Sequence, residues 1–174
     1  MTYQEANEIV AKAFTLPENV QIHLRRSLGR EDNELTAMDR IQLNSIIPET
    51  ASRLDRAKCA FCVGLACLYK GKDQIPLPEA VGEQGKKEMS NDLETVLKKA
   101  ARVIDSHSKD WDEFRANLWA LIKYLDAKGY CVAAGPLLSD LLAWDARDRF
   151  VQDRWERTIA RVMYTKKNEV IIDD

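Results

Sequence analysis

Hydrophobic residues recur along most of the chain at intervals of three or four, the spacing typical of amphipathic α-helices. Residues 3–14 carry this pattern first, and Pro17 is well placed to open a second helix that ends near Gly29. A shorter helical pattern covers 38–47, after which Pro48 forces a break. Each of these segments is therefore expected to form a helix with one buried face.

The segment 54–69 is apolar on nearly every side in its second half, which predicts the central buried helix of the fold. The segment 71–89 holds two prolines and three glycines, and we expect it to be a long connecting loop. The alternation typical of a half-buried strand is confined to the short tail 169–172. Further helical patterns cover 92–105, 111–127, 134–144 and 146–164.

These patterns predict an all-α fold, a bundle of about seven to eight helices joined by mostly short turns. We expect one helical domain over residues 1–174, and two small helical lobes joined near 71–89 remain an alternative. The composition, 45% hydrophobic and 31% charged with only 7 glycines and 5 prolines, is typical of a soluble, mostly helical chain. Membrane-spanning runs and a secretory leader are absent from the sequence, so a cytoplasmic location is expected.

Sequence motifs for catalysis are missing. The chain has no phosphate-binding loop, no dinucleotide-binding glycine motif, no zinc-protease helix and no nucleophile elbow. The two histidines, His23 and His107, fall in no motif that would supply a nucleophile or an orienting group. We therefore expect no catalytic residues, no cofactor and no enzymatic activity.

Two cysteines, Cys59 and Cys62, form a C-x-x-C motif that could be half of a zinc site or a redox pair. A tetrahedral zinc site would need two further ligands, and Cys67 and Cys131 lie in other apolar segments. Because small apolar residues flank these thiols, burial as core residues is favoured over metal binding. No metal is expected.

The distribution of charge near the C-terminus is more informative. Residues 147–167 contain five Arg and two Lys against two Asp and one Glu, a net +4 in a chain whose net charge is −2. At about 100° per residue, Val151, Trp155, Ile159 and Val162 share one face of a helix. Four arginines lie together on its flank: Arg147, Arg154, Arg157 and Arg161.

Grouped arginines of this kind suit the phosphate groups of a nucleic-acid backbone, because each guanidinium offers forked donors. The alternative is a solvated helix face in which neighbours form intrahelical pairs, such as Asp153 with Arg157 one turn later. The pattern by itself leaves both interpretations open.

The order of these segments resembles a known family over about residues 20–164. LLSDLLAWDARDRFVQDRWERTIARVMY is similar to a leucine-rich helix followed by Asp-Leu, a Trp and a terminal helix with Arg and Trp. Three further segments resemble, in order, that family's early double arginine, its buried helix and its basic middle segment: IHLRRSLGR, AKCAFCVGLACLYKG and VLKKAARVIDS. The chain thus resembles the CasB family, the small subunit of the type I-E CRISPR Cascade effector complex.

This resemblance implies a non-enzymatic subunit, present in two copies, whose partners are the other subunits of the effector complex, guide RNA and target DNA. The implied task is to stabilise the R-loop by holding the displaced DNA strand and bracing the guide–target heteroduplex through backbone contacts. By position, the nucleic-acid-binding residues would be Arg25, Arg26, Lys98, Lys99, Arg102, Arg147, Arg154, Arg157 and Arg161.

Two other functions compete with this expectation. One is a helical adaptor that binds protein partners without nucleic-acid contact, its arginines pairing with a partner or with Asp148, Asp153 and Glu156. The other is a small helical enzyme, which would require a metal at Cys59 and Cys62.

Overall fold

The computed structural model describes residues 2–28, 35–88 and 95–165, and this part of the chain is built from α-helices. In chain order the helices are α1 (Tyr3–Lys12), α2 (Glu18–Ser27), α3 (Ala37–Asn44), α4 (Arg53–Leu68), α5 (Leu77–Glu88), α6 (Thr95–Ile104), α7 (Trp111–Ala127), α8 (Ala134–Leu142) and α9 (Phe150–Tyr164). A 3₁₀ turn, Ala13–Thr15, follows α1. The predicted all-α fold is confirmed, and an isolated bridge between Ile75 and Val132 is the sole β pairing in these described ranges.

Short polar side chains fix where three of these helices begin. The hydroxyl of Thr2 accepts a hydrogen bond from Glu5 N at 3.2 Å, and Thr36 accepts one from Asp39 N at 3.2 Å. In both cases the carboxylate three residues later bonds back to the cap, which completes a capping box. Ser52 caps α4 through Asp55 N at 3.1 Å. These starts follow from local sequence rather than from packing.

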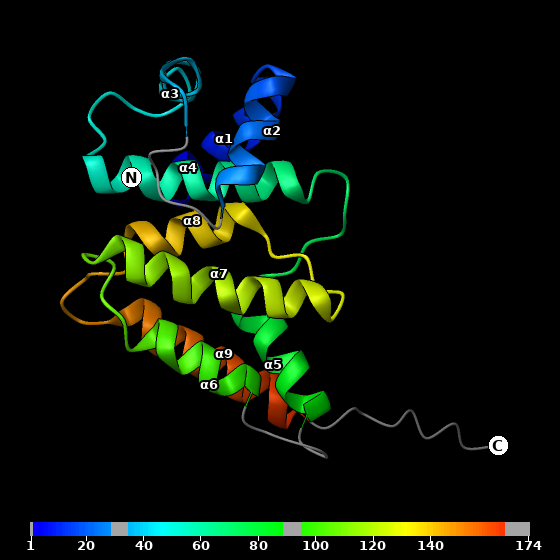
Figure 1. The fold of residues 1–174 in the computed structure, drawn as a ribbon. Coiled ribbons are helices and arrows are strands. Elements are labelled where there is room, and N and C mark those ends of the chain that lie inside the picture. The colour runs from blue at the N-terminus through cyan, green and yellow to red at the C-terminus, as the bar shows by residue number, and fades with distance from the viewer. Residues whose placement is uncertain (1, 29–34, 89–94, 166–174) are drawn as a thin grey trace.

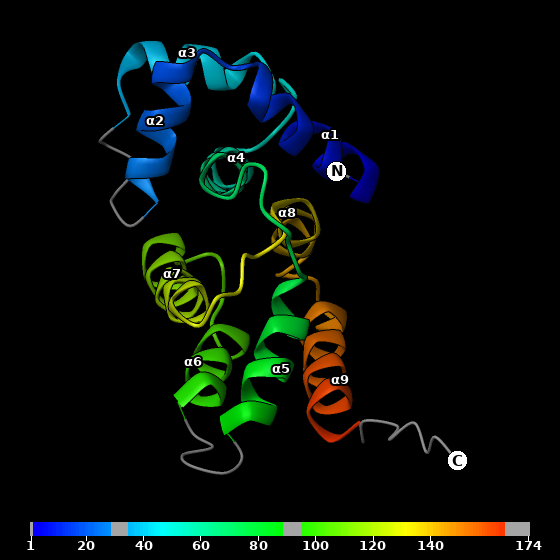
Figure 2. The ribbon, with the colours of Figure 1, turned by 90° about the vertical axis from the view of Figure 1, so that its right-hand side faces the viewer.

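The helices stack in three levels, as Figures 1 and 2 show. The upper level contains α1, α2, α3 and α4, the middle level α7 and α8, and the lower level α5, α6 and α9. Residues Phe61 to Cys67 of α4 are all buried, which confirms the predicted central helix. Buried side chains from every level join in one hydrophobic cluster. The helices described here include none long and apolar enough to cross a bilayer.

The expectation of a long loop over 71–89 is wrong, because α5 occupies Leu77–Glu88. Pro76 and Pro78 lie at the start of this helix, where a missing backbone N–H costs little. The carbonyl oxygen of Pro76 accepts hydrogen bonds from Glu79 N and Ala80 N, both at 3.0 Å, and so begins the hydrogen bonding of the helix. The glycines also serve packing: a Cβ at Gly82 would lie 2.6 Å from Val162 Cβ of α9. The prolines of this segment thus mark the start of α5, and the glycine at position 82 allows α5 to approach α9 closely.

Two smaller expectations lie outside the described residues, namely the end of the second helix at Gly29 and the strand-like tail 169–172. The choice between one domain and two small lobes stays a prediction.

The buried carboxylate of Asp39 connects α3 to α2. Asp39 is 1% exposed and its Oδ1 lies 2.9 Å from His23 Nδ1, while Oδ2 accepts hydrogen bonds from Thr36. Burial by itself raises the pKa of Asp39, but the hydrogen bonds from Thr36 and His23 outweigh this effect and hold the pKa below its usual value.

A group whose pKa is lowered by folding stabilises the protein above its unfolded pKa, about 3.9 for Asp. At pH 7 we expect Asp39→Asn to lower the free energy of unfolding by about 1–2 kcal/mol. The gap between variant and wild type should shrink as pH falls through the folded pKa, because wild-type Asp39 then becomes neutral too. Urea denaturation at pH 7 and pH 3 checks this. The exposed Asp73 provides the control, since Asp73→Asn should leave stability unchanged at both pH values; a pH-independent gap for Asp39→Asn would contradict the prediction.

Candidate nucleic-acid interface

The last helix, α9, is anchored by aromatic side chains. Trp144 and Trp155 are each 1% exposed, and their ring centroids lie 4.8 Å apart at an interplanar angle of 71°. Trp144 also contacts Phe114 of α7, with centroids 5.2 Å apart. Val151, Trp155 and Ile159 are buried as the helical periodicity predicted, whereas Val162 is half-buried against α5. The rotation of α9 about its axis is therefore set by its apolar face.

Polar contacts fix the same helix more finely. Trp155 Nε1 donates to Asp140 Oδ2 at 2.6 Å, and Arg154 forms an ion pair with Asp140 Oδ1. The Asp140 side chain is only 13% exposed, and burial raises its pKa even though Trp155 and Arg154 favour the charged form. Arg154 thus already has a carboxylate partner, so it is less available to a phosphate than the other arginines of α9.

The next two arginines of the helix are exposed. Arg157 Nε donates to the backbone oxygen of Asp153 at 3.1 Å, and among the described residues no ion pair joins Arg157 to the Asp153 carboxylate, the pairing that one of the two interpretations proposed. Among the described residues, no side chain makes a hydrogen bond or ion pair with the guanidinium of Arg161. Arg161 is thus a free cation among the described residues, whereas Arg157 makes an intrahelical hydrogen bond to a backbone oxygen but no ion pair.

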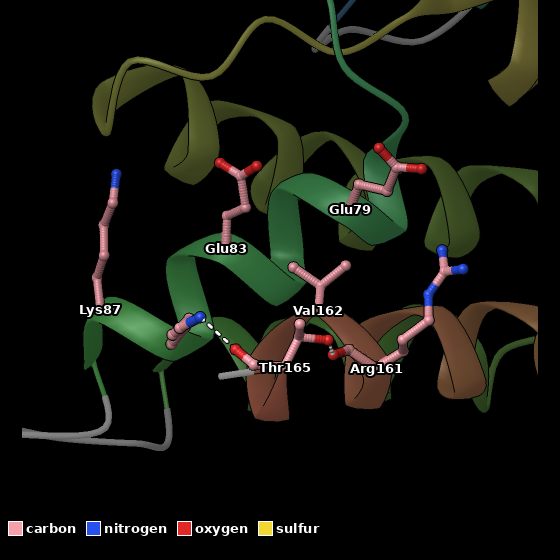
Figure 3. Close-up of a pocket in the computed structure, with 7 residues that line it drawn as sticks. Glu79, Glu83, Lys87, Arg161, Val162 and Thr165 are labelled. Atoms are coloured by element: carbon pink, nitrogen blue, oxygen red, sulfur yellow. Dashed lines mark hydrogen bonds between the residues drawn. The ribbon is translucent and has the colours of Figure 1, made fainter. Parts of the chain in front are cut away.

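Arg161 borders a groove of about 730 Å³ between α5 and α9. Figure 3 shows Arg161 and Lys87 at opposite ends of this groove, with Glu79 and Glu83 along α5. Lys86 Nζ donates to Thr165 O at 2.6 Å, and Lys87 Nζ lies 4.8 Å from the centre of the Tyr130 ring. Neither lysine was among the predicted binding residues, and the segment 71–89 that contains them was expected to be a loop. The two glycines that precede these lysines in the sequence did not indicate that the segment forms a helix packed against α9.

The remaining predicted cations are divided between two places. Lys98, Lys99 and Arg102 lie on α6 in the lower level, and Lys99 Nζ is 5.8 Å from the Tyr124 ring centre. An apolar groove of about 370 Å³ separates α6 from α9. Arg25 and Arg26 are exposed in the last turn of α2, a helix of the upper level (Figures 1 and 2). The structure thus gathers the α6 and α9 residues in one level and leaves the α2 pair apart.

Arg147 lies in the turn before α9 rather than on the helix, and it is exposed. It lines a cavity of about 250 Å³ together with Lys109 from the α6–α7 turn and Arg149, which immediately precedes α9. The predicted flank of four arginines is therefore three on α9 and one at its entry.

The cysteines lie in and around the core. Cys59, Cys62 and Cys67 are buried and Cys131 is half-buried, and all four are free thiols. Burial raises the pKa of the Cys59 thiol to about 12 and that of Cys62 well above its usual value, which disfavours the thiolate needed for metal or redox chemistry. Within the described ranges, no group of three or more His, Cys, Asp and Glu side chains is placed to hold a metal ion.

No protein-family model, curated protein or solved structure matches this chain. Exposed cations on α9 and α5 form a surface that could bind an anion. Contacts of Trp144, Trp155 and Asp140 fix the rotation of α9 and so keep its arginines on this surface.

Proposed function

We propose that this chain is a non-catalytic subunit that binds nucleic-acid backbone within a guide-RNA CRISPR surveillance complex. It would hold the displaced DNA strand and brace the guide–target heteroduplex, and so stabilise the R-loop. The observation that carries this proposal is the exposure of Arg157 and Arg161 on a rigidly anchored helix, where Arg161 lines the same groove as Lys86 and Lys87 of α5. The resemblance of the sequence to the CasB family is the reason for proposing this type of complex. The partners of the chain would then be the other subunits of the complex and a second copy of itself.

Backbone binding suits both the charge pattern and the task. Arginine donates to phosphate oxygens in a forked geometry, and several arginines neutralise a strand additively. R-loop formation is a nearly balanced exchange of one duplex for another, so a few phosphate contacts are enough to shift it. The guide RNA would supply sequence recognition, and this chain would need no contact with base edges.

The double substitution Arg157→Ala, Arg161→Ala tests the proposal, because neither side chain supports the core. We expect weaker binding to single-stranded DNA. The slope of log affinity against log salt should become shallower by about 0.7 for each phosphate that the variant no longer neutralises. Fluorescence anisotropy with a labelled oligonucleotide, titrated at low and near-physiological salt, measures both quantities.

A variant with the same change in net charge is the control. Lys12 and Arg53 are exposed on α1 and α4, in the upper level, so Lys12→Ala, Arg53→Ala should leave the salt slope unchanged. Equal effects of the two double variants would mean that only net charge matters. A wild-type chain that does not bind DNA even at low salt would contradict direct contact by the isolated chain.

One observation favours a second function, a helical adaptor for protein partners. Met38 and Ile41 of α3 are 59% and 63% exposed, and their spacing of three residues puts them on one face of the helix. Such side chains are common in protein contacts. If Met38→Asp, Ile41→Asp abolished assembly with partners while the arginine variant changed nothing, the adaptor function would replace backbone binding.

A further inference from the structure

The exposed side of α9 carries two aromatic rings as well as arginines. Phe150, the first residue of the helix, is 42% exposed, and Tyr164, the last, is 67% exposed. In the core, by contrast, Trp144 and Trp155 pack edge to face on each other. In the described part of the chain, neither Phe150 nor Tyr164 stacks on an aromatic ring or a cation. A large part of each ring is therefore accessible to a ligand.

The two rings lie on the same side of the helix as the exposed arginines. At about 100° per residue, Phe150, Arg157 and Tyr164 fall within about 40° of one another, because successive members are seven residues apart. Arg161 falls within about 20° of Phe150, on the side of α9 opposite its buried face. At about 1.5 Å per residue, the rings are about 21 Å apart along the axis, with both arginines between them. These four residues form the exposed line of α9.

The carboxylates near the exposed line of α9 leave its two arginines without an ion pair. Asp153 lies one turn before Arg157 but forms no ion pair with it among the described residues. Glu156 borders the apolar groove between α6 and α9, and Arg154 takes the carboxylate of Asp140. The exposed line thus presents two flat apolar rings with two guanidinium groups between them.

A single nucleic-acid strand suits this pattern better than a duplex or a protein partner. Surfaces that bind single strands combine cations that follow the phosphates with aromatic rings on which bases stack. In a duplex the bases already stack on one another, so their faces are not available to a protein ring. An apolar protein surface would match the rings, but it would bury the guanidinium groups between them without an anion, which costs free energy.

From this arrangement we infer that Phe150 and Tyr164 each stack on one base of a single strand, while Arg157 and Arg161 bind phosphates between those bases. The inference rests on the proposed backbone-binding function and deepens it, because contact with base faces selects a single strand over a duplex. Stacking tolerates any sequence, since every base has a π-face. Sequence recognition would still come from the guide RNA.

The double substitution Phe150→Leu, Tyr164→Leu tests the two stacking sites. Leucine keeps apolar bulk and favours a helix, but it offers no π-face. Because both side chains are exposed, the melting temperature should stay close to that of the wild type. Affinity for single-stranded oligothymidylate should fall about ten-fold or more. The slope of log affinity against log salt should not change, because no phosphate contact is lost, whereas Arg157→Ala, Arg161→Ala makes that slope shallower.

Two exposed rings elsewhere in the chain provide a matched control. Tyr3 and Phe14 are 58% and 39% exposed, on α1 and on the 3₁₀ turn that follows it. The variant Tyr3→Leu, Phe14→Leu removes the same two residue types from the upper level, so it should keep wild-type affinity for oligothymidylate. Equal losses in the two leucine variants would overturn the assignment of stacking to α9.

An abasic strand of the same length tests the contact with bases directly. It carries the phosphates of oligothymidylate without the bases, so the wild type should prefer oligothymidylate, and Phe150→Leu, Tyr164→Leu should bind both strands equally. Equal binding of both strands by the wild type, or wild-type affinity in that variant, would overturn the stacking sites and leave the rings as contacts for a protein partner. If Arg157→Ala, Arg161→Ala weakens binding in that case, the proposed function stands; if the wild type binds neither strand even at low salt, both fail.

Discussion

Replacement of Trp144 by alanine is expected to lower the free energy of unfolding by about 3–5 kcal/mol. Trp144 is 1% exposed and packs against both Phe114 and Trp155. The substitution would leave a cavity between α7 and α9 and remove the hydrogen bond from Nε1 to Ser106 O. Since a domain of this size is stable by only about 5–15 kcal/mol, the variant should be close to unfolding at ordinary temperatures. Denaturation by guanidinium chloride, followed by circular dichroism, measures the change.

Two further variants separate packing from hydrogen bonding. Trp144→Phe keeps most of the aromatic volume and loses only the Nε1 donor, so a smaller loss, about 1–3 kcal/mol, is expected. Tyr164→Ala removes a side chain that is 67% exposed on α9 and should change stability by less than about 0.5 kcal/mol. A loss below about 1 kcal/mol for Trp144→Ala would show that this aromatic contact does not anchor α9.

The helices that the sequence predicted well have strong periodicity and local signals at their ends. The helix expected over 111–127 coincides with α7, because its apolar spacing is regular and Gly129 follows its end. The all-round apolar run at 54–69 similarly predicted the buried α4. In these segments local sequence and tertiary packing favour the same structure, so periodicity was sufficient.

The helix α5 was missed for a physical reason. Proline and glycine oppose helix formation on average, yet Pro78 lies in the first turn and Gly82 and Gly85 face α9. Whether a glycine in a sequence marks a loop or a close helix contact depends on what lies opposite, and the opposite residues here are about 80 positions away. Local pattern contains no information about that partner.

The candidate interface was predictable only within a single helix. The apolar face of α9 fixed which arginines share a flank, and Arg157 and Arg161 are exposed there. The pairing of Arg154 with Asp140 and the placement of Lys86 beside Thr165 both join different helices, so they depend on the packed fold. The left-handed conformation of Arg149 has no signal in the sequence, because arginine is not a residue that prefers it.

The contact between α5 and α9 leads to the second large effect. We expect Gly82→Val to lower the free energy of unfolding by about 1–3 kcal/mol or more, because the new Cβ would lie 2.6 Å from Val162 Cβ and 3.1 Å from Ile159 O. The backbone oxygen cannot rotate away as a side chain can, so the two helices must separate. The same displacement changes the shape of the groove that Arg161, Lys86 and Lys87 line, and binding to single-stranded DNA should weaken as well. Chemical denaturation and anisotropy measure the two effects.

A matched substitution and a double-mutant cycle isolate the cause. Glu83 is the exposed neighbour of Gly82 on α5, so Glu83→Val tests the cost of a β-branched residue in this helix without the clash. Val162→Gly removes the opposing Cβ, and it should make Gly82→Val less costly than in the wild-type background, with a coupling of about 1 kcal/mol or more. Additive effects, or equal losses for Gly82→Val and Glu83→Val, would mean that α5 and α9 do not approach closely at Gly82. The groove that brings Arg161 together with Lys86 and Lys87 would then lose its structural basis, and the arginines of α9 would have to bind a strand without the lysines of α5.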